Sequence, residues 1–279
     1  MGRKQIEIAV LGALIIGIIL YAGAGIVYAG ALTSSAERTL NTVVSHQNSL
    51  NTSFNEIDSE ASALGGSGTF NPQQAVGLVD RSVTSSQVAA LTINRDDSLL
   101  ASVQGQLDSS RWLTLAGHST MDRESARVGH ARNALGAARM IAADQVLDGH
   151  FWHALYTALG ELDTLNTQAG SGDYASAKTT QAKLQTDVAQ AVQQSTAPGL
   201  PPELHSLMVD LQTFVSDFGK QLDAQTAGDD AAVAQYQSSL DGDRNKLATY
   251  NVDKIGSDID AFYRPMIERF NSEIAAATS

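Results

Sequence analysis

The sequence predicts an all-α protein in which a single N-terminal transmembrane helix precedes an extracytoplasmic antiparallel bundle of about six helices. Residues 8–36 form an apolar run without a charged residue, long enough to cross a bilayer of about 30 Å. Beyond this run, apolar residues recur at steps of three and four, the period of an amphipathic helix. No later segment shows the apolar–polar alternation of a strand.

The charges around the apolar run predict its direction. Arg3 and Lys4 precede it, and the first charges after it are Glu37 and Arg38. Because basic residues flanking a membrane helix stay in the cytoplasm, we expect the N-terminus inside and the remaining chain outside the cytoplasmic membrane. The predicted segments are a cytoplasmic tip with the anchor (1–32), a coiled-coil-like helical hairpin (33–117) and a helical bundle with two related hairpins (118–279).

Two alternatives concern the fate of this run. A secreted protein would be cleaved after small residues, and 22–24 and 29–31 both read Ala-Gly-Ala, although the length favours a retained anchor. Gly2 followed five positions later by Glu7 resembles the leader of type IV pilins, which implies a pilin-like subunit. Arg3 and Lys4 depart from that family pattern.

Small residues recur every four positions within the run, at the spacing that allows membrane helices to pack closely: Ala9, Ala13 and Gly17, then Gly25 and Ala29. The alternative is that Gly and Ala are common in membrane helices. The spacing leaves open whether this helix packs against a partner protein in the membrane or against a second copy of the chain.

Composition limits the partners. The net charge is −12, and because the first seven residues contribute +1 (Arg3, Lys4 and Glu7), the rest carries −13. Such an acidic body argues against nucleic acid and against docking on anionic lipid. The absence of cysteine excludes thiolate metal sites and Cys nucleophiles.

The first predicted outer helix, about 33–64, carries a heptad seam that indicates coiled-coil-like packing: Leu40, Val43, Gln47, Leu50, Phe54, Ile57, Ala61 and Leu64. Gln47 is its one polar position, and we expect it to be partly exposed. After the break at 65–68, Pro72 opens a second helix whose polar stretch at 92–98 predicts a kink or interruption. A third helix begins near Ser119, with a candidate break at 148–149.

The last part repeats itself with an offset of 56 residues. Gly172-Asp173 recurs as Gly228-Asp229, and Gln181, Leu184 and Asp187 recur as Gln237, Leu240 and Asp243. Each Gly-Asp should end one helix and open the next, with Asp accepting from free amides of the first turn, so we expect a helical hairpin used twice. Residues 198–202 form a Pro-rich connection between the hairpins, and Pro265 should kink or restart the final helix.

His150 and His153 are the weak candidates for a metal site, because they lie one helical turn apart with Asp148 nearby. The alternative is an aromatic packing patch of Phe151, Trp152 and Tyr156. The Glu-x-x-His motif of helical carboxylate-bridged sites is absent. We therefore predict no catalytic, cofactor-binding or metal-binding residues.

The expected function is non-enzymatic: protein–protein interaction or scaffolding outside the membrane, as an accessory subunit of a membrane complex. The bilayer and a protein of unknown identity are the expected partners. The alternative is ligand sensing, since an anchor followed by a helical bundle resembles the outer half of a chemoreceptor or sensor kinase. With one membrane helix, such a protein would signal through a partner.

Overall fold

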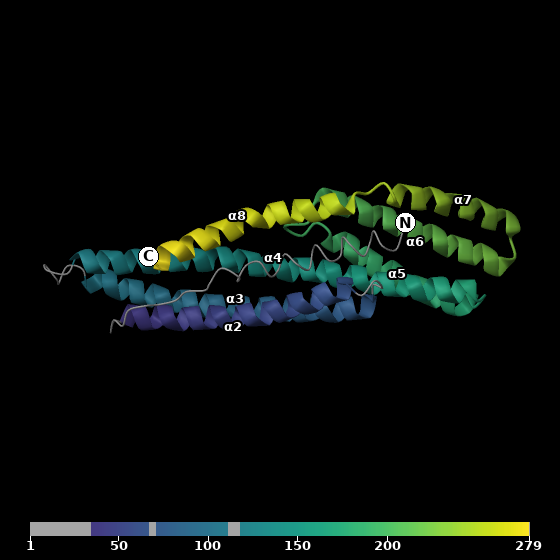
Figure 1. Ribbon diagram of the computed structural model, residues 1–279. Coiled ribbons are helices and arrows are strands. Elements are labelled where there is room, and N and C mark those ends of the chain that lie inside the picture. The colour runs from purple at the N-terminus through teal and green to yellow at the C-terminus, as the bar shows by residue number, and fades with distance from the viewer. Residues whose placement is uncertain (1–34, 67–70, 111–117, 279) are drawn as a thin grey trace. The chain divides into compact units, whose positions relative to one another are not determined.

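The computed structural model describes residues 35–66, 71–110 and 118–278, and these residues confirm the all-α prediction. They contain no strand and form seven helices, one more than expected (Figure 1): α2 (Ser35–Gly66), α3 (Pro72–Ser110), α4 (His118–Gly170), α5 (Tyr174–Gln194), α6 (Pro202–Ala227), α7 (Asp230–Leu247) and α8 (Val252–Thr278). The predicted anchor (1–32) lies outside the described residues. Among the helices described, none is long and apolar enough to cross a membrane.

The chain divides into two compact units that share its long helices. Among the described residues, unit 1 comprises 60–81 and 147–260, and unit 2 comprises 35–59, 82–146 and 261–278. Each unit therefore draws on both of the predicted segments 33–117 and 118–279.

The heptad seam of α2 is buried within unit 2, as its spacing predicts. Six seam positions are each at most 8% exposed: Leu40, Val43, Gln47, Leu50, Phe54 and Ile57. The expectation that Gln47 is partly exposed is wrong, because its exposed fraction is only 4%. It is buried because its Nε2 donates to Asp96 of α3, whose Oδ2 lies 3.3 Å away.

Asp96 is a fully buried carboxylate of unit 2. Its Oδ1 lies 2.8 Å from Nδ1 of His46, which is also on α2. On the next residue of α3, Asp97 accepts from Arg132 and Arg139 of α4, at 2.8 and 3.1 Å. Two adjacent carboxylates thus join α3 to two different helices.

The end of α8 is joined to α4 within the same unit. Nδ1 of His130 lies 2.7 Å from Oε2 of Glu273, and Arg127 donates from Nε to the carbonyl of Ala277 at 2.9 Å. Tyr263 and Phe270 of α8 are almost fully buried. Apolar packing and polar contacts therefore both hold this helix to unit 2.

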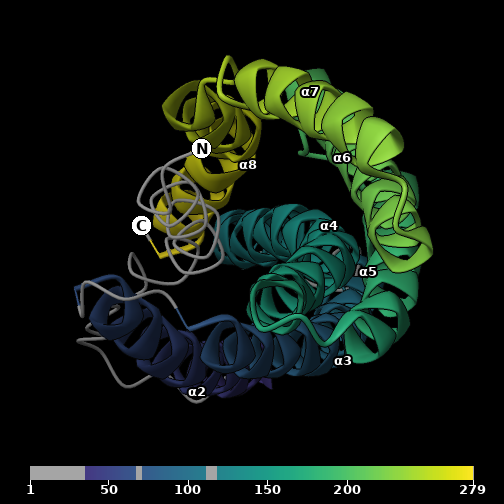
Figure 2. The ribbon, with the colours of Figure 1, turned by 90° about the vertical axis from the view of Figure 1, so that its right-hand side faces the viewer.

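Unit 1 contains two helical hairpins, α4–α5 and α6–α7, each with a Gly-Asp pair at its turn. Gly172 and Gly228 both have positive φ, +79° and +71°, where residues with a Cβ are strained. The following Asp173 and Asp229 accept from the amides of Ser176 and Ala232 and so cap α5 and α7. Figure 2 shows α6 and α7 running side by side as one of these hairpins.

Three predicted interruptions are absent, because each lies within one continuous helix. Helix α3 passes through 92–98, where the polar residues Asn94, Arg95 and Ser98 are exposed and the buried Asp96 is paired. Helix α4 continues through 148–149. An interior glycine costs only about 0.5–1 kcal/mol relative to alanine, and Phe151 beyond it is fully buried.

Helix α8 likewise continues past Pro265, so the final helix does not restart there. Proline removes one backbone hydrogen bond from a helix. Tyr263 on one side of it and Phe270 on the other are each only 1% exposed. Their burial offsets the lost bond.

Candidate functional site

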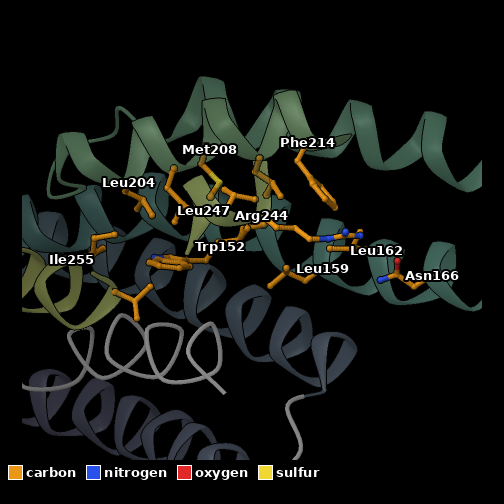
Figure 3. A pocket seen from close by; sticks show the side chains of 14 residues that line it. Trp152, Leu159, Leu162, Asn166, Leu204, Met208, Phe214, Arg244, Leu247 and Ile255 are labelled. Atoms are coloured by element: carbon orange, nitrogen blue, oxygen red, sulfur yellow. The ribbon is translucent and has the colours of Figure 1, made fainter. Parts of the chain in front are cut away.

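Unit 1 contains an apolar pocket of about 260 Å³ (Figure 3). Side chains from α4, α6, α7 and α8 line it. An apolar cavity of about 150 Å³ accommodates benzene, so this pocket has room for a larger molecule. It lies just below the range of about 300–1,000 Å³ that is common for drug-sized ligands.

Two helices supply most of the lining. From α4 come Trp152, Leu155, Leu159, Leu162 and Asn166, and from α6 come Leu204, Leu207, Met208, Leu211 and Phe214. The α4 residues step by three and four, so they form one stripe along the helix. On α6, the lining side of the helix adjoins the buried residues Val215, Phe218 and Leu222. The amphipathic period of both helices thus creates the pocket walls.

The end of α7 and the start of α8 complete the wall with Arg244, Leu247, Val252 and Ile255. Asp210 of α6, which is 9% exposed, fixes this connection by accepting from Lys246 Nζ at 2.6 Å and from Tyr250 Oη at 2.7 Å. Burial acts to raise the pKa of Asp210, but these two hydrogen bonds outweigh it and hold the pKa below the ordinary value. Burial and Asp210 together raise the pKa of Tyr250 to about 12.

The pocket has two polar side chains, Arg244 and Asn166. Arg244 places its guanidinium carbon 5.7 Å from the centroid of the Phe214 ring, in cation–π range. Its Nη1 donates to Asp241 at 2.8 Å, one turn earlier on α7. Arg244 is therefore the one charged group among the lining side chains.

Trp152 belongs to an aromatic cluster on α4. Its ring contacts Phe151 edge-on at 4.9 Å between centroids and lies 5.8 Å from Tyr156. Phe151 and Tyr156 are fully buried, and burial raises the pKa of the Tyr156 phenol. The predicted aromatic packing patch is present, and Trp152 extends it to the pocket.

The weak metal candidates His150 and His153 differ in their surroundings. Nδ1 of His153 lies 2.7 Å from Oδ1 of Asp80 on α3, within unit 1, whereas His150 is exposed. In the described ranges, no three His, Cys, Asp or Glu side chains gather as they would around a metal ion. Neither histidine lines the pocket.

The predicted membrane-packing residues Ala9, Ala13, Gly17, Gly25 and Ala29 lie outside the described residues. In the sequence, the spacing of Leu155, Leu159 and Leu162 indicates one apolar side of a helix, and no pattern marks Arg244 or Asn166 as pocket residues. Periodicity shows which side of a helix is apolar. It gives no signal for whether opposing side chains fill the space between two such sides.

No known protein family, curated protein or solved structure matches this chain.

Proposed function

We propose that the protein is a single-pass membrane protein whose extracytoplasmic helical body binds a small, mainly apolar molecule in the unit 1 pocket. The observation that carries this proposal is the concave surface of apolar side chains from four helices. Pockets with apolar walls and a few polar groups are the usual binding sites for small molecules. Occupancy of the pocket would be read by a partner protein.

The polar groups of the pocket favour binding over catalysis. An arginine side chain remains protonated, and an asparagine amide is neither a nucleophile nor a general base. Both are suited to orienting a ligand by hydrogen bonds. We therefore propose a non-enzymatic role.

Binding can be tested through Trp152, which lines the pocket. Trp112 is the only other tryptophan, so Trp112→Phe leaves Trp152 as the sole tryptophan fluorophore. The full chain in nanodiscs of zwitterionic lipid would be titrated with 1-decanol. We expect a saturable change in fluorescence that is lost in Leu159→Phe, which fills part of the pocket, and kept in Leu147→Phe.

Leu147 is the matched control because it is an exposed leucine on α4 that does not line the pocket. A linear change without saturation, or equal responses of the two leucine variants, would contradict binding in the pocket.

The membrane part of the proposal rests on the apolar run at 8–36 and its flanking charges. Because the chain has no cysteine, single cysteines report sidedness directly. In right-side-out membrane vesicles, an impermeant maleimide should label Thr167→Cys, an exposed position on α4, without permeabilisation. Gln5→Cys should react only after permeabilisation, and the reverse pattern would invert the proposed topology.

A second candidate function, interaction or scaffolding, is favoured by an apolar surface on α3 within unit 2. Val88, Leu91 and Leu99 are exposed, Leu91 by 71%, and their spacing of three and eight positions places them on one side of the helix. Exposed apolar patches often mark protein interfaces. If this surface holds a partner or a second copy, Leu91→Gln with Leu99→Gln should abolish co-purification from membranes, whereas the pocket variant Leu159→Phe should not.

A further inference from the structure

We infer that the natural ligand of the unit 1 pocket is an anionic amphipath, with an apolar chain along the pocket and a carboxylate or phosphate head at Arg244. This inference rests on the ligand-binding role proposed above. It adds the charge of the ligand and its orientation.

The pocket is chemically asymmetric along its length. In Figure 3, Trp152 and Ile255 lie toward one end, and the guanidinium of Arg244 points toward the other, where Asn166 lies. The first end offers only apolar surface to a ligand, together with an indole ring. A molecule with one polar head therefore fits in one direction, with its head at Arg244 and its chain toward Trp152.

Arg244 is suited to accept an anion. A guanidinium carries five N–H donors in a plane, a geometry that matches carboxylate and phosphate oxygens. One donor is used by Asp241, whose own side chain is 60% exposed. Exposed ion pairs of this kind are weak, so a ligand oxygen can share the guanidinium or displace the carboxylate.

Two contacts position the guanidinium of Arg244 before a ligand arrives. The Phe214 ring lies beneath the guanidinium, and Asp241 holds it from the same helix. Such preorganisation lowers the entropy that ligand binding must remove. Arg244 is 44% exposed, so a head group at this end can also keep contact with water.

The charge of the site is opposite to that of the chain. The protein carries a net charge of −12, yet the one charged side chain that lines the pocket is positive. Arg244 would repel the positive head of a cationic amphipath, whereas it would neutralise the negative head of an anionic one. The local charge, rather than the net charge, therefore selects the ligand.

The test uses the full chain with Trp112→Phe in zwitterionic nanodiscs and four probes that share a ten-carbon chain: decanoate, decyl phosphate, 1-decanol and decyltrimethylammonium. We expect decanoate or decyl phosphate to bind about tenfold more tightly than decanol, the effect of one charge-assisted hydrogen bond. Arg244→Gln should remove this difference, and Arg244→Lys should keep most of it. Circular dichroism confirms that each variant is helical.

The two anions distinguish the sources of the head group. If decanoate binds more tightly than decyl phosphate, the natural ligand is a free carboxylic acid. If decyl phosphate binds more tightly, the natural ligand is a single-chain phospholipid. Either result supports the inference.

Failure of the inference differs from failure of the proposed function. If all four probes bind alike and Arg244→Gln changes none of them, the pocket binds ligands but does not select anions, and the inference is overturned. If no probe gives a saturable response that Leu159→Phe removes, the ligand-binding role itself is wrong.

Discussion

Glu161 of α4 lies close enough to Asp187 of α5, inside unit 1, for the two carboxyl groups to interact electrostatically, and Oε2 of Glu161 is buried without a hydrogen-bond partner. Burial and the neighbouring Asp187 raise the pKa of Glu161 from 4.5 to about 7, although Lys183 opposes the shift. Burial and a neighbouring carboxylate both disfavour the charged form of a carboxyl group. Glu161 therefore keeps its proton to a higher pH than an isolated glutamate does.

This pair predicts a stability that depends on pH. Since the pKa of Glu161 is raised in the folded state, its favourable contribution is complete below about pH 4.5 and is lost as the pH rises to about 7. Glu161→Gln keeps a hydrogen-bond donor but cannot ionise. At pH 8 it should raise the free energy of unfolding by about 1 kcal/mol, because partial exposure of Glu161 screens the full shift.

Thermal melts at pH 4.5 and pH 8 measure this effect. A gain of about 1 kcal/mol corresponds to roughly 2–4 °C in Tm for a chain of this size, and we expect it only at pH 8. Glu268→Gln, at an exposed position on α8, is the control and should behave alike at both pH values. An equal gain at both pH values for Glu161→Gln would contradict the explanation.

The repeat places a second carboxyl pair 56 positions further on, where Asp217 and Asp243 correspond to Glu161 and Asp187. Burial, then Asp217 and Asp210, raise the pKa of Asp243. Lys220 lies 2.7 Å from Asp217 and compensates part of the charge. The two hairpins thus share an acidic pair as well as a turn.

The helices and turns of unit 1 could be predicted because their signals are local. Asp173 and Asp229 cap helices through amides three residues away, and Pro202 opens α6 at its first turn. Partners that are distant in sequence were not predictable. His46 and Asp96 are separated by 50 residues, and nothing in either segment shows that the two side chains would pair.

The pocket was not predictable for a related reason. Leu159 and Leu211 each belong to an apolar helical stripe, and such a stripe normally packs against another. Whether the opposing stripes meet or leave space depends on side-chain volumes and helix separation, which periodicity does not encode. Arg244 likewise looks like an ordinary surface residue of α7 until Phe214 is found beneath it.

The buried Asp96 predicts a large loss of stability on truncation. Asp96→Ala removes the acceptor of His46 and Gln47 and leaves the buried Gln47 amide without its partner. We expect the free energy of unfolding to fall by about 2–3 kcal/mol, measured by urea denaturation of the full chain. Asn94→Ala, at an exposed position on the same helix, should change it by less than about 0.5 kcal/mol.

A double variant separates the lost hydrogen bond from lost packing. Gln47→Leu in the Asp96→Ala background removes the unsatisfied amide, so it should recover more than half of the loss. No recovery would show that the buried polar pair is not the cause.

The contact between Tyr250 and Asp210 predicts a second effect of pH. Tyr250→Phe removes one of two hydrogen bonds to a buried carboxylate and should cost about 1.5 kcal/mol at pH 8. Because the pKa of Tyr250 is raised from 10 to about 12, this contribution is complete below pH 10 and is lost as the pH rises to about 12.

Urea denaturation at pH 8 and pH 11 should therefore show a smaller difference between the two proteins at the higher pH. Tyr236→Phe, at a half-buried position on α7, provides the control for loss of a hydroxyl group. A cost that stays constant with pH would refute the role of the phenol proton.

Replacing Gly228 or Gly242 by alanine should change the free energy of unfolding in opposite directions. Gly228 ends α6 with φ +71°, and its N–H bonds to the carbonyls of Ala224 and Gln225. Gly242 lies within α7, and at neither glycine would an added Cβ meet another atom within 4 Å. Both positions therefore have room for a Cβ atom, and they differ only in backbone conformation.

Gly228→Ala should lower the free energy of unfolding by about 1–2 kcal/mol, the cost of a left-handed conformation for a residue with a Cβ. Gly242→Ala should raise it by about 0.5–1 kcal/mol, because alanine loses less entropy in a helix. Urea denaturation of the two variants beside the parent protein measures both. Effects of the same sign would mean that α6 does not end in the left-handed turn that begins the second hairpin.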